Sequence, residues 1–551
     1  MGKKERKAKK FKGLTDNQEH IVYVGELVKQ GKNITHAVIE LCNKLNYPYS
    51  DSLRRAFSKQ LGKRGVTESK KEVVSIEQSD EYKEALSREL PKSKYYIVTW
   101  AQAETEVHKP FWENMKAYAD FIGAEIIVQA GRYKSPTSLE ANERVKDRER
   151  GSLIWAKELQ PYLYASRLNI SEKLEVLCDV KVQPTAILPI SGLNGFTADS
   201  SCILPHPKVQ LQSLPILEGY NHKLILSTGA VTLPNYTDTK AGKKGEFHHQ
   251  LGFVIVEIDS DKRFHLRQVQ ADDSGDFIDL WNCVKGCCVY DYRRDYDGSG
   301  SEDYSIVWGD LHVRNRDPKA VDLAISLSQD LKVKNVILHD LLDAEAINHH
   351  EERDPFRLLY KEDNKLDDLE AEIAETLNAL ESYITQVPTA TFHNIASNHS
   401  DFIDRWLRDV DWRKVRNKRM YLKLANVVAE GKAPKGVLNY LLSINLPEVK
   451  TYGYGDSLRI KGWELALHGD LGVNGSRGGI KQFKNLSTKT ITAHSHSPQR
   501  QDGSIVAGTL TKLRLSYNKG LSSWVQGVVL IYPNGKATNI HFIDYKYTTL
   551  K

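Results

Sequence analysis

The spacing of apolar residues predicts three short helices near the start of the chain. Apolar side chains recur every third or fourth residue from Asn17 to Gln30, from Thr35 to about Leu45, and from Ser50 to Leu61. The last two runs open on residues that cap helices, and the turn sequence Asn-Tyr-Pro-Tyr separates them. This order is typical of a helix-turn-helix unit.

The predicted third helix places basic side chains beside an apolar face. The apolar face consists of Leu53, Phe57 and Leu61. The neighbouring basic residues are Arg54, Arg55 and Lys59. A recognition helix in the major groove of DNA has this arrangement, so we predict that these three residues bind DNA. A helical protein-interaction module is the alternative, because helix-turn-helix layouts are common.

A second region, residues 94–295, has the pattern of an α/β domain. Tyr95–Trp100 and Ala124–Ala130 are predicted strands, and Pro110–Ile122 between them is a predicted helix. Further strands are expected at Lys223–Ser227 and Leu251–Ile258. The pattern assigns this domain no chemistry, although it is a candidate surface for a protein partner or a homo-oligomer.

Two polar segments are expected to lack a packed structure. Residues 66–93 are rich in Glu, Lys and Ser, which predicts a linker with at most a solvated helix. Asp238–His249 is expected to be a loop that either touches a phosphate backbone or is simply solvated. Its basic residues are Lys240, Lys243, Lys244, His248 and His249. The expected division of the chain is 1–65, 66–93, 94–295 and 303–551.

From Tyr304 onward, five strand-like runs each lead into residues that can bind metal ions. Because strands of open α/β sheets place ligands at their carboxyl ends, the five groups are expected to converge. In chain order they are Asp310 with His312, Asp340, Asn398 with His399, His468, and His494 with His496. One such pair alone would mean little, but five in order indicate a single site.

The donor types favour a pair of divalent cations. Two such ions need a bridging carboxylate and a mixed shell of imidazole, carboxylate and amide groups. Asp, Asn and His side chains supply that shell, which suits manganese, with iron or zinc as alternatives, better than magnesium. The chemistry expected of such a site is activation of water for attack on a phosphate ester, without a covalent intermediate.

The order of these residues resembles the calcineurin-like metallophosphoesterases. That superfamily has the pattern D-x-H, G-D, G-N-H-D/E, H and G-H-x-H, and it includes the SbcD-type repair nucleases. The resemblance covers about residues 303–551 and implies a calcineurin-like α/β sandwich. The expected fold class is therefore multidomain α/β, with a helix-turn-helix-like unit, a middle α/β domain and this sandwich.

The resemblance also implies a role for each residue. Asp340 would bridge the two ions, and His399 would protonate the leaving oxygen or stabilise the charged transition state. The other ligands of the first ion would be Asp310, His312 and His496. Those of the second ion would be Asn398, His468 and His494.

Four positions depart from the family pattern. The acidic residue after Asn-His is Ser400, so His399 lacks its usual orienting neighbour unless Asp401 substitutes. The three glycine positions are occupied by His339, Ser397 and Ala493. Every proposed ligand is nevertheless present, so we expect activity. Asp343 fits the family's G-D-x-x-D extension and is expected to support the loop.

A glycine-rich stretch follows His468. Residues Gly472–Gly479, with Arg477 inside them and Lys481 beyond, can present backbone N–H groups and cations to a phosphate chain. A flexible loop without a ligand is the alternative. We therefore predict Arg477 and Lys481 as further DNA contacts.

Charge placement adds a reason to expect a nucleic-acid partner. The whole chain of 551 residues carries a net charge of +6, whereas residues 1–65 hold fifteen Lys or Arg and only six Asp or Glu. A basic end of this kind favours a polyanion as partner, with a merely solvated tail as the alternative.

The remaining composition places the chain among cytoplasmic proteins. No apolar run is long enough to span a membrane, and the basic N-terminus is not a signal peptide. Six cysteines in this length fit a reducing compartment. The arrangement also resembles large phage-encoded early proteins with roles in DNA transfer or host-DNA breakdown, which implies the host cytoplasm.

Together these features predict a metal-dependent phosphodiesterase that acts on DNA. A basic helical unit supplies affinity for a polyanion, and the attached metal site supplies hydrolysis. Two alternatives remain: a phosphatase or small-molecule phosphodiesterase, and a non-catalytic DNA-binding takeover factor that uses the domain as a scaffold.

Overall fold

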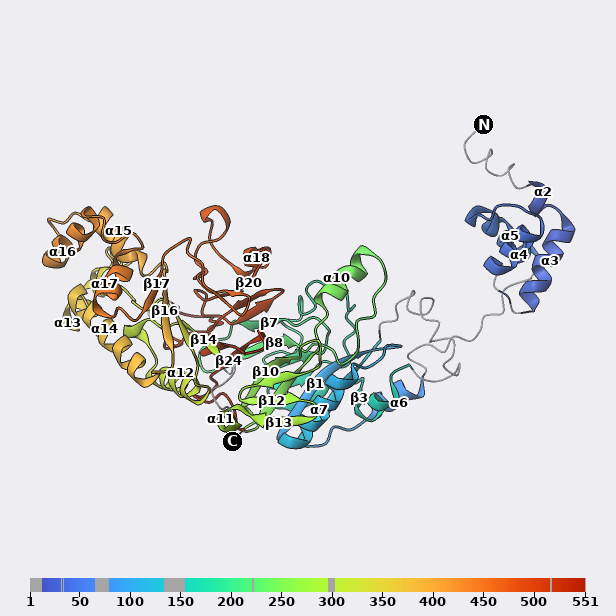
Figure 1. Cartoon of the computed structure of the whole chain (residues 1–551), viewed down its shortest axis with the longest axis horizontal. Coiled ribbons are helices and arrows are strands. Elements are labelled where there is room, and N and C mark those ends of the chain that lie inside the picture. The colour runs from blue at the N-terminus through green and yellow to red at the C-terminus, as the bar shows by residue number, and fades with distance from the viewer. Residues whose placement is uncertain are drawn as a thin grey trace. The chain divides into compact units, whose positions relative to one another are not determined.

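The computed structural model describes residues 12–30, 32, 34–64, 79–132, 154–220, 222–295, 303–515 and 518–550. The chain forms two compact units, Met1–Gln78 and Ser79–Lys551 (Figure 1). The first eleven residues of the basic tail and residues 66–78 of the expected linker lie outside the described residues. The described part is mixed α/β, with several sheets and helices.

The first unit contains the three expected helices, preceded by the single turn α2 (Lys12–Thr15). They are α3 (Gln18–Lys29), α4 (Ile34–Lys44) and α5 (Asp51–Lys63). Side chains of Asn17 and Ser50 accept backbone N–H bonds at the starts of α3 and α5 and so fix where these helices begin. Leu53, Phe57 and Leu61 of α5 are buried in the core between the helices, as the apolar spacing predicts.

The second unit begins with α6 (Asp80–Ser87), which corrects the expectation of a solvated linker up to residue 93. This helix is packed because Tyr82 and Ala85 are buried and the ring of Tyr82 stacks on Trp155 at 6.3 Å. Arg88 after it donates hydrogen bonds to the carbonyls of Gln160 and Leu163. Tyr82 and Ala85 therefore pack this helix into the second unit, while Leu86 stays exposed.

A five-stranded sheet contains the expected strand-helix-strand unit. β1 (Tyr95–Gln102) and β2 (Ala124–Gly131) are parallel neighbours joined by α7 (Lys109–Ile122). The strand order is β10-β9-β1-β2-β3. The other members are β9 (Gly252–Ile258), β10 (Phe264–Gln270) and β3 (Leu163–Tyr164).

The expected loop at 238–249 is instead the helix α10 (Lys240–His248). Glycines at positions 242 and 245 have low helix propensity, which is why the sequence pattern hides this helix. Both are buried where the helix packs closely: a Cβ on Gly242 would lie 1.9 Å from the Thr237 carbonyl oxygen. Close packing of these glycines against Tyr236, Thr237 and the distant Thr185 therefore favours the helix over its local propensity.

A six-stranded sheet of order β17-β16-β15-β14-β23-β24 holds the first part of the metal-ligand pattern. Its first four strands are parallel, and they are β14 (Ser305–Asp310), β15 (Asn335–His339), β16 (Thr391–Ile395) and β17 (Lys450–Tyr452). The antiparallel strands are β23 (Gly527–Ile531) and β24 (Ala537–His541). Figure 1 shows helices gathered on one side of this sheet. The main ones are α12 (Pro318–Asp330), α13 (Pro355–Asp363), α14 (Leu369–Gln386), α15 (Asp401–Asp409), α16 (Lys418–Ala429) and α17 (Val437–Asn445).

A ten-stranded sheet crosses the expected boundary between residues 94–295 and 303–551. Its order is β18-β19-β20-β22-β21-β7-β8-β6-β5-β4. The strands after the boundary are β18 (Arg459–Ile460), β19 (Trp463–Glu464), β20 (Lys489–Thr492), β22 (Ser504–Val506) and β21 (Gln499–Gln501). Those before it are β7 (Leu211–Leu214), β8 (Lys223–Ser227), β6 (Ser201–Leu204), β5 (Leu174–Val176) and β4 (Leu168–Ser171). Both segments thus lie in one compact unit.

The six- and ten-stranded sheets pack against each other through an apolar core. Val307 and Ile337 of the first sheet lie in one buried cluster with Trp463, Ile491 and Ile505 of the second. This packing brings the strand ends of both sheets to the same place. No helix within the described residues is long and apolar enough to cross a membrane.

Candidate metal centre

The predicted ligands come from strand ends of two sheets. Asp310 is the last residue of β14, and Asp340 directly follows β15. From the ten-stranded sheet, His494 and His496 follow β20. The ligand groups therefore converge where two packed sheets meet. This corrects the expectation that they all lie at the strand ends of one open sheet.

Four of the predicted ligands have an unusual backbone conformation. The φ angles are positive at His312 (44°), Asp340 (43°), His494 (67°) and His496 (56°). For residues other than glycine this left-handed region costs energy, on the order of 1–3 kcal/mol each, and it clusters at functional sites. The turns therefore aim these side chains at the expense of local stability.

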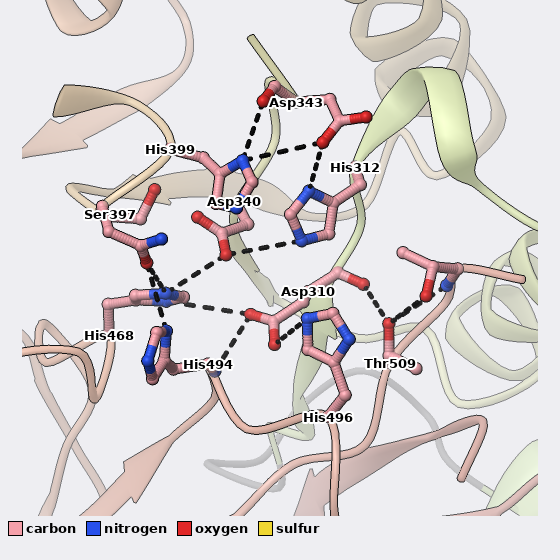
Figure 2. Close-up of polar contacts among 12 residues, drawn as sticks. Asp310, His312, Asp340, Asp343, Ser397, His399, His468, His494, His496 and Thr509 are labelled. Carbon is pink, nitrogen blue, oxygen red and sulfur yellow. Dashed lines mark hydrogen bonds and ion pairs between the residues drawn. The ribbon is translucent and has the colours of Figure 1, made fainter. Parts of the chain in front are cut away.

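Asp340 lies at the middle of the group. Its Oδ2 is 3.2 Å from Nε2 of His468 and 3.5 Å from Nε2 of His312, as Figure 2 shows. The side chain is buried at 2% exposure. One carboxylate thus faces an imidazole on each side, which is the position required of a bridging ligand.

The first three-residue cluster surrounds one face of Asp340. Ligand atoms of His312, Asp340 and His496 all lie within 4.8 Å of one another. Asp310 joins them, because its Oδ2 is 3.0 Å from Nε2 of His496. Thr509 holds Asp310 in place by donating a hydrogen bond of 2.9 Å to its backbone carbonyl.

The second cluster lies on the other face. Asp340, His468 and His494 again have ligand atoms within 4.8 Å of one another. The side-chain oxygen of Asn398 is 3.0 Å from Nε2 of His468 and 3.1 Å from Nδ1 of His494. The other six predicted ligands therefore gather around Asp340, and Figure 2 labels all of them except Asn398.

Several buried polar atoms of the group have no hydrogen-bond partner among the described residues. They are Oδ1 of Asp340, Nε2 of His312 and Nδ1 of His468. Leaving such atoms unsatisfied costs about 1–3 kcal/mol each, and an ion is one explanation for them. Their identity as carboxylate and imidazole atoms fits divalent transition-metal ions.

The electrostatics of the group favour cations. Burial alone would lower the pKa of His468, but the carboxylates of Asp340 and Asp310 outweigh it and raise that pKa to about 9. For His312, Asp343 and Asp340 likewise overcome burial and raise the pKa to about 9. The carboxylates of the site therefore favour nearby positive charge, which divalent ions would supply.

Asp343 orients two histidines of the group. Its Oδ1 is 3.1 Å from Nδ1 of His312, so the Nε2 of that ring faces Asp340. Its backbone carbonyl accepts a 2.7 Å hydrogen bond from Nδ1 of His399. The expected substitute, Asp401, instead pairs with Arg405 at 3.3 Å, which corrects the sequence reading of how His399 is oriented.

His399 lies between an aromatic ring and the polar groups of the site. Its ring stacks on Phe402 at 4.8 Å and meets His312 edge-on at 4.5 Å. Burial lowers the pKa of His399. With Nδ1 donating to the Asp343 carbonyl, Nε2 is the nitrogen left for a substrate.

The predicted DNA contacts fall into two sets, one in each compact unit. Arg55 and Lys59 are exposed on α5 of the first unit, and Arg54 is half-buried there. Arg477 and Lys481 are exposed in the second unit, after His468. The sequence did not indicate that Thr509 supports Asp310, because no local pattern links residues 199 positions apart.

Comparisons with known proteins give one extensive likeness. No protein-family model matches the chain, and no solved structure matches it. The chain is 29% identical to Protein A1 of Escherichia phage T5 over 487 residues, which covers 83% of this chain and 84% of that protein. By sequence, the chain is similar to a phage protein along most of its length.

Proposed function

We propose that this protein is a metal-dependent phosphodiesterase that hydrolyses DNA. The observation that carries the proposal is the meeting of two ligand clusters on the shared carboxylate of Asp340, with buried atoms of Asp340, His312 and His468 lacking other partners. Two divalent ions there would supply positive charge and Lewis acidity for attack of water on a phosphodiester.

The residues of the site would have two kinds of role, metal binding and proton donation. Asp310, Asp340 and Asn398 lie where the two cations would bind, and buried imidazoles complete each of the two ligand clusters. His399, fixed through its Nδ1 by the Asp343 carbonyl, presents Nε2 to the leaving oxygen. In its doubly protonated, imidazolium form the ring donates a proton or a hydrogen bond from Nε2 as negative charge develops, a role that typically contributes 10²–10⁴-fold in rate.

DNA is the proposed substrate because the first unit is basic and helical. Exposed Arg55 and Lys59 of α5 lie outside the apolar core, where they are available to phosphate groups. The likeness to a phage protein adds the setting of a host cytoplasm, where DNA breakdown by such an enzyme would act on host or phage DNA.

The direct test is a nuclease assay with purified full-length protein. Linear duplex, closed circular and single-stranded DNA are incubated with Mn²⁺, Fe²⁺, Zn²⁺ or a chelator. We expect cleavage only with a divalent ion, and none with Asp340→Ala at equal concentration. Cleavage that survives both the chelator and Asp340→Ala would reject the two-metal site.

Two other results would select the alternatives. Hydrolysis of small phosphate esters without any action on DNA would identify a phosphatase or a small-molecule phosphodiesterase. Tight DNA binding without hydrolysis of either substrate class, with every metal tried, would identify a non-catalytic DNA-binding factor.

A further inference from the structure

Helix α10 exposes several lysines and the aromatic ring of Phe247, which meets the ring of its neighbour His248 edge-on at 5.0 Å. It packs through Gly242 and Gly245, so its larger side chains point outward. Phe247 is 80% exposed, and Lys240 and Lys244 are exposed beside it. The exposed ring leaves an aromatic face open to a ligand beside these lysines.

The C-terminal end of α10 meets a second basic element. Lys208 is buried and binds Asp502 together with the carbonyl of Ile187, so this carboxylate already has a cationic partner. Nδ1 of His248 is also 3.4 Å from Asp502. Burial is the largest cause of the lowered pKa of His248, and the nearby charges of Lys244 and Lys484 lower it further. Lys484 directly follows α18 (Ile480–Phe483).

These groups give the surface an excess of positive charge. Lys243 pairs with Asp238 and Glu246, and Asp502 is shared by Lys208 and His248. Within the part of the chain that the structure describes, Lys240, Lys244 and Lys484 have no carboxylate partner. Lys481 of α18 is likewise exposed and without one. The surface formed by α10 and α18 is therefore suited to a chain of phosphates.

A loop closed at its base joins this surface to the metal centre. The loop of residues 470–479 leaves directly after His468 and Gly469, and the Gly478 N–H donates to the Asp470 carbonyl at 2.7 Å to close its base. A Cβ on Gly478 would lie 2.0 Å from the Gly469 carbonyl oxygen, so the two ends of the loop touch. α18 begins immediately after the loop, which fixes its lysines relative to the ligands.

We propose that the α10–α18 surface binds single-stranded DNA, with the lysines on phosphates and a base stacked on Phe247. This inference rests on the proposed function and specifies single-stranded DNA as the form of its substrate. Non-specific single-strand sites combine basic grooves with exposed aromatic rings in this way, and stacking is available to every base. Duplex DNA would offer phosphates to the lysines but no unstacked base to the ring.

The test is binding of fluorescent oligothymidylate to the full-length protein in a chelator, measured by anisotropy against salt. The variants are Phe247→Ala and the double change Lys244→Glu with Lys484→Glu. Matched controls are Phe356→Ala, a ring 83% exposed on α13, and Lys418→Glu, an exposed lysine of α16. Four of the five substituted side chains are exposed and Lys484 is half-buried, and thermal melting checks that each variant folds.

We expect Phe247→Ala to weaken binding of the single strand about tenfold and to leave binding of a matched duplex unchanged. The double lysine variant should weaken binding of the single strand further. It should also reduce the slope of log affinity against log salt by about 1.4, because two phosphate contacts are lost at about 0.7 each on a single strand. Controls should stay within twofold.

Two results would overturn the proposal. Oligothymidylate binding by both test variants at wild-type strength would show that the surface does not bind DNA. If the lysine variant loses affinity equally for single strand and duplex, and Phe247→Ala changes neither, the surface would be a site for the duplex backbone instead. The assay contains no free metal and measures binding alone. Its result therefore tests the surface even if the proposed enzymatic function is wrong.

Discussion

At the scale of single residues, Asp343 gives the sharpest prediction. Asp343→Ala removes the acceptor that fixes His312 Nδ1, while the backbone carbonyl that holds His399 stays. Losing an oriented ligand of this kind typically costs 10- to 100-fold in metal affinity or activity. We expect that loss in Mn²⁺ titrations. The control is Asp401→Ala, whose partner is Arg405, and it should bind Mn²⁺ as the wild type does.

His399→Ala should separate rate from metal binding. The imidazole is held by the Asp343 carbonyl and is not among the seven ligands, so the variant should keep its metal content. Its rate on bis-p-nitrophenyl phosphate should fall by about 10²–10⁴-fold, the usual contribution of a general acid. Elemental analysis together with the rate constant checks both halves. A variant that loses metal would show that His399 is a ligand.

The sequence could supply the identity of the ligands but not their supports. Asp310, Asp340 and His468 stand out because metal chemistry requires those side chains after strand-like runs. The orientation of His399 depends on Asp343, which is 56 residues away in sequence and acts through a backbone atom. No side-chain pattern encodes such a contact.

At the scale of elements, Arg267 of β10 forms a buried charge cluster outside the metal centre. Its guanidinium binds Asp279 through two hydrogen bonds of 2.7 and 2.8 Å and also binds Glu257 of β9. All three side chains are almost completely buried. Removing the cation would leave two carboxylates buried without their partner.

Arg267→Met should therefore lower the free energy of unfolding by about 3–5 kcal/mol, the usual effect of breaking a buried pair. Arg263→Met is the matched control, because Arg263 pairs with Asp259 in a partly exposed position. It should cost only about 0–1 kcal/mol. Urea unfolding followed by tryptophan fluorescence measures both. Equal effects of the two changes would contradict this account.

Elements with regular apolar spacing were predictable, and those shaped by tertiary contact were not. The predicted strands and helix around α7 match the structure to within two residues, because their periodicity is clear. α10 was missed because Gly242 and Gly245 weaken its helical pattern but allow close packing. The pairing of β21 with β7 involves only two residue pairs and joins segments nearly 300 positions apart.

At the scale of the whole molecule, the first unit should contribute binding and the second should contribute chemistry. Removing residues 1–78, the unit that carries α5, should weaken duplex binding and reduce its salt slope by about 0.9 for each lost phosphate contact. Hydrolysis of bis-p-nitrophenyl phosphate should continue at close to the full rate. Binding of duplex by the truncated chain with the wild-type slope would place the duplex-binding surface elsewhere.

The pairing of β21 with β7 also decides which fragments of this chain can be handled in solution. A fragment of residues 303–551 would keep every proposed ligand but would lose β7, and the backbone N–H and C=O groups along one side of β21 would be open to other chains. Bare strand edges promote aggregation. On size-exclusion chromatography we expect that fragment in the void volume, whereas residues 79–551, with the edge covered, should elute as a discrete species.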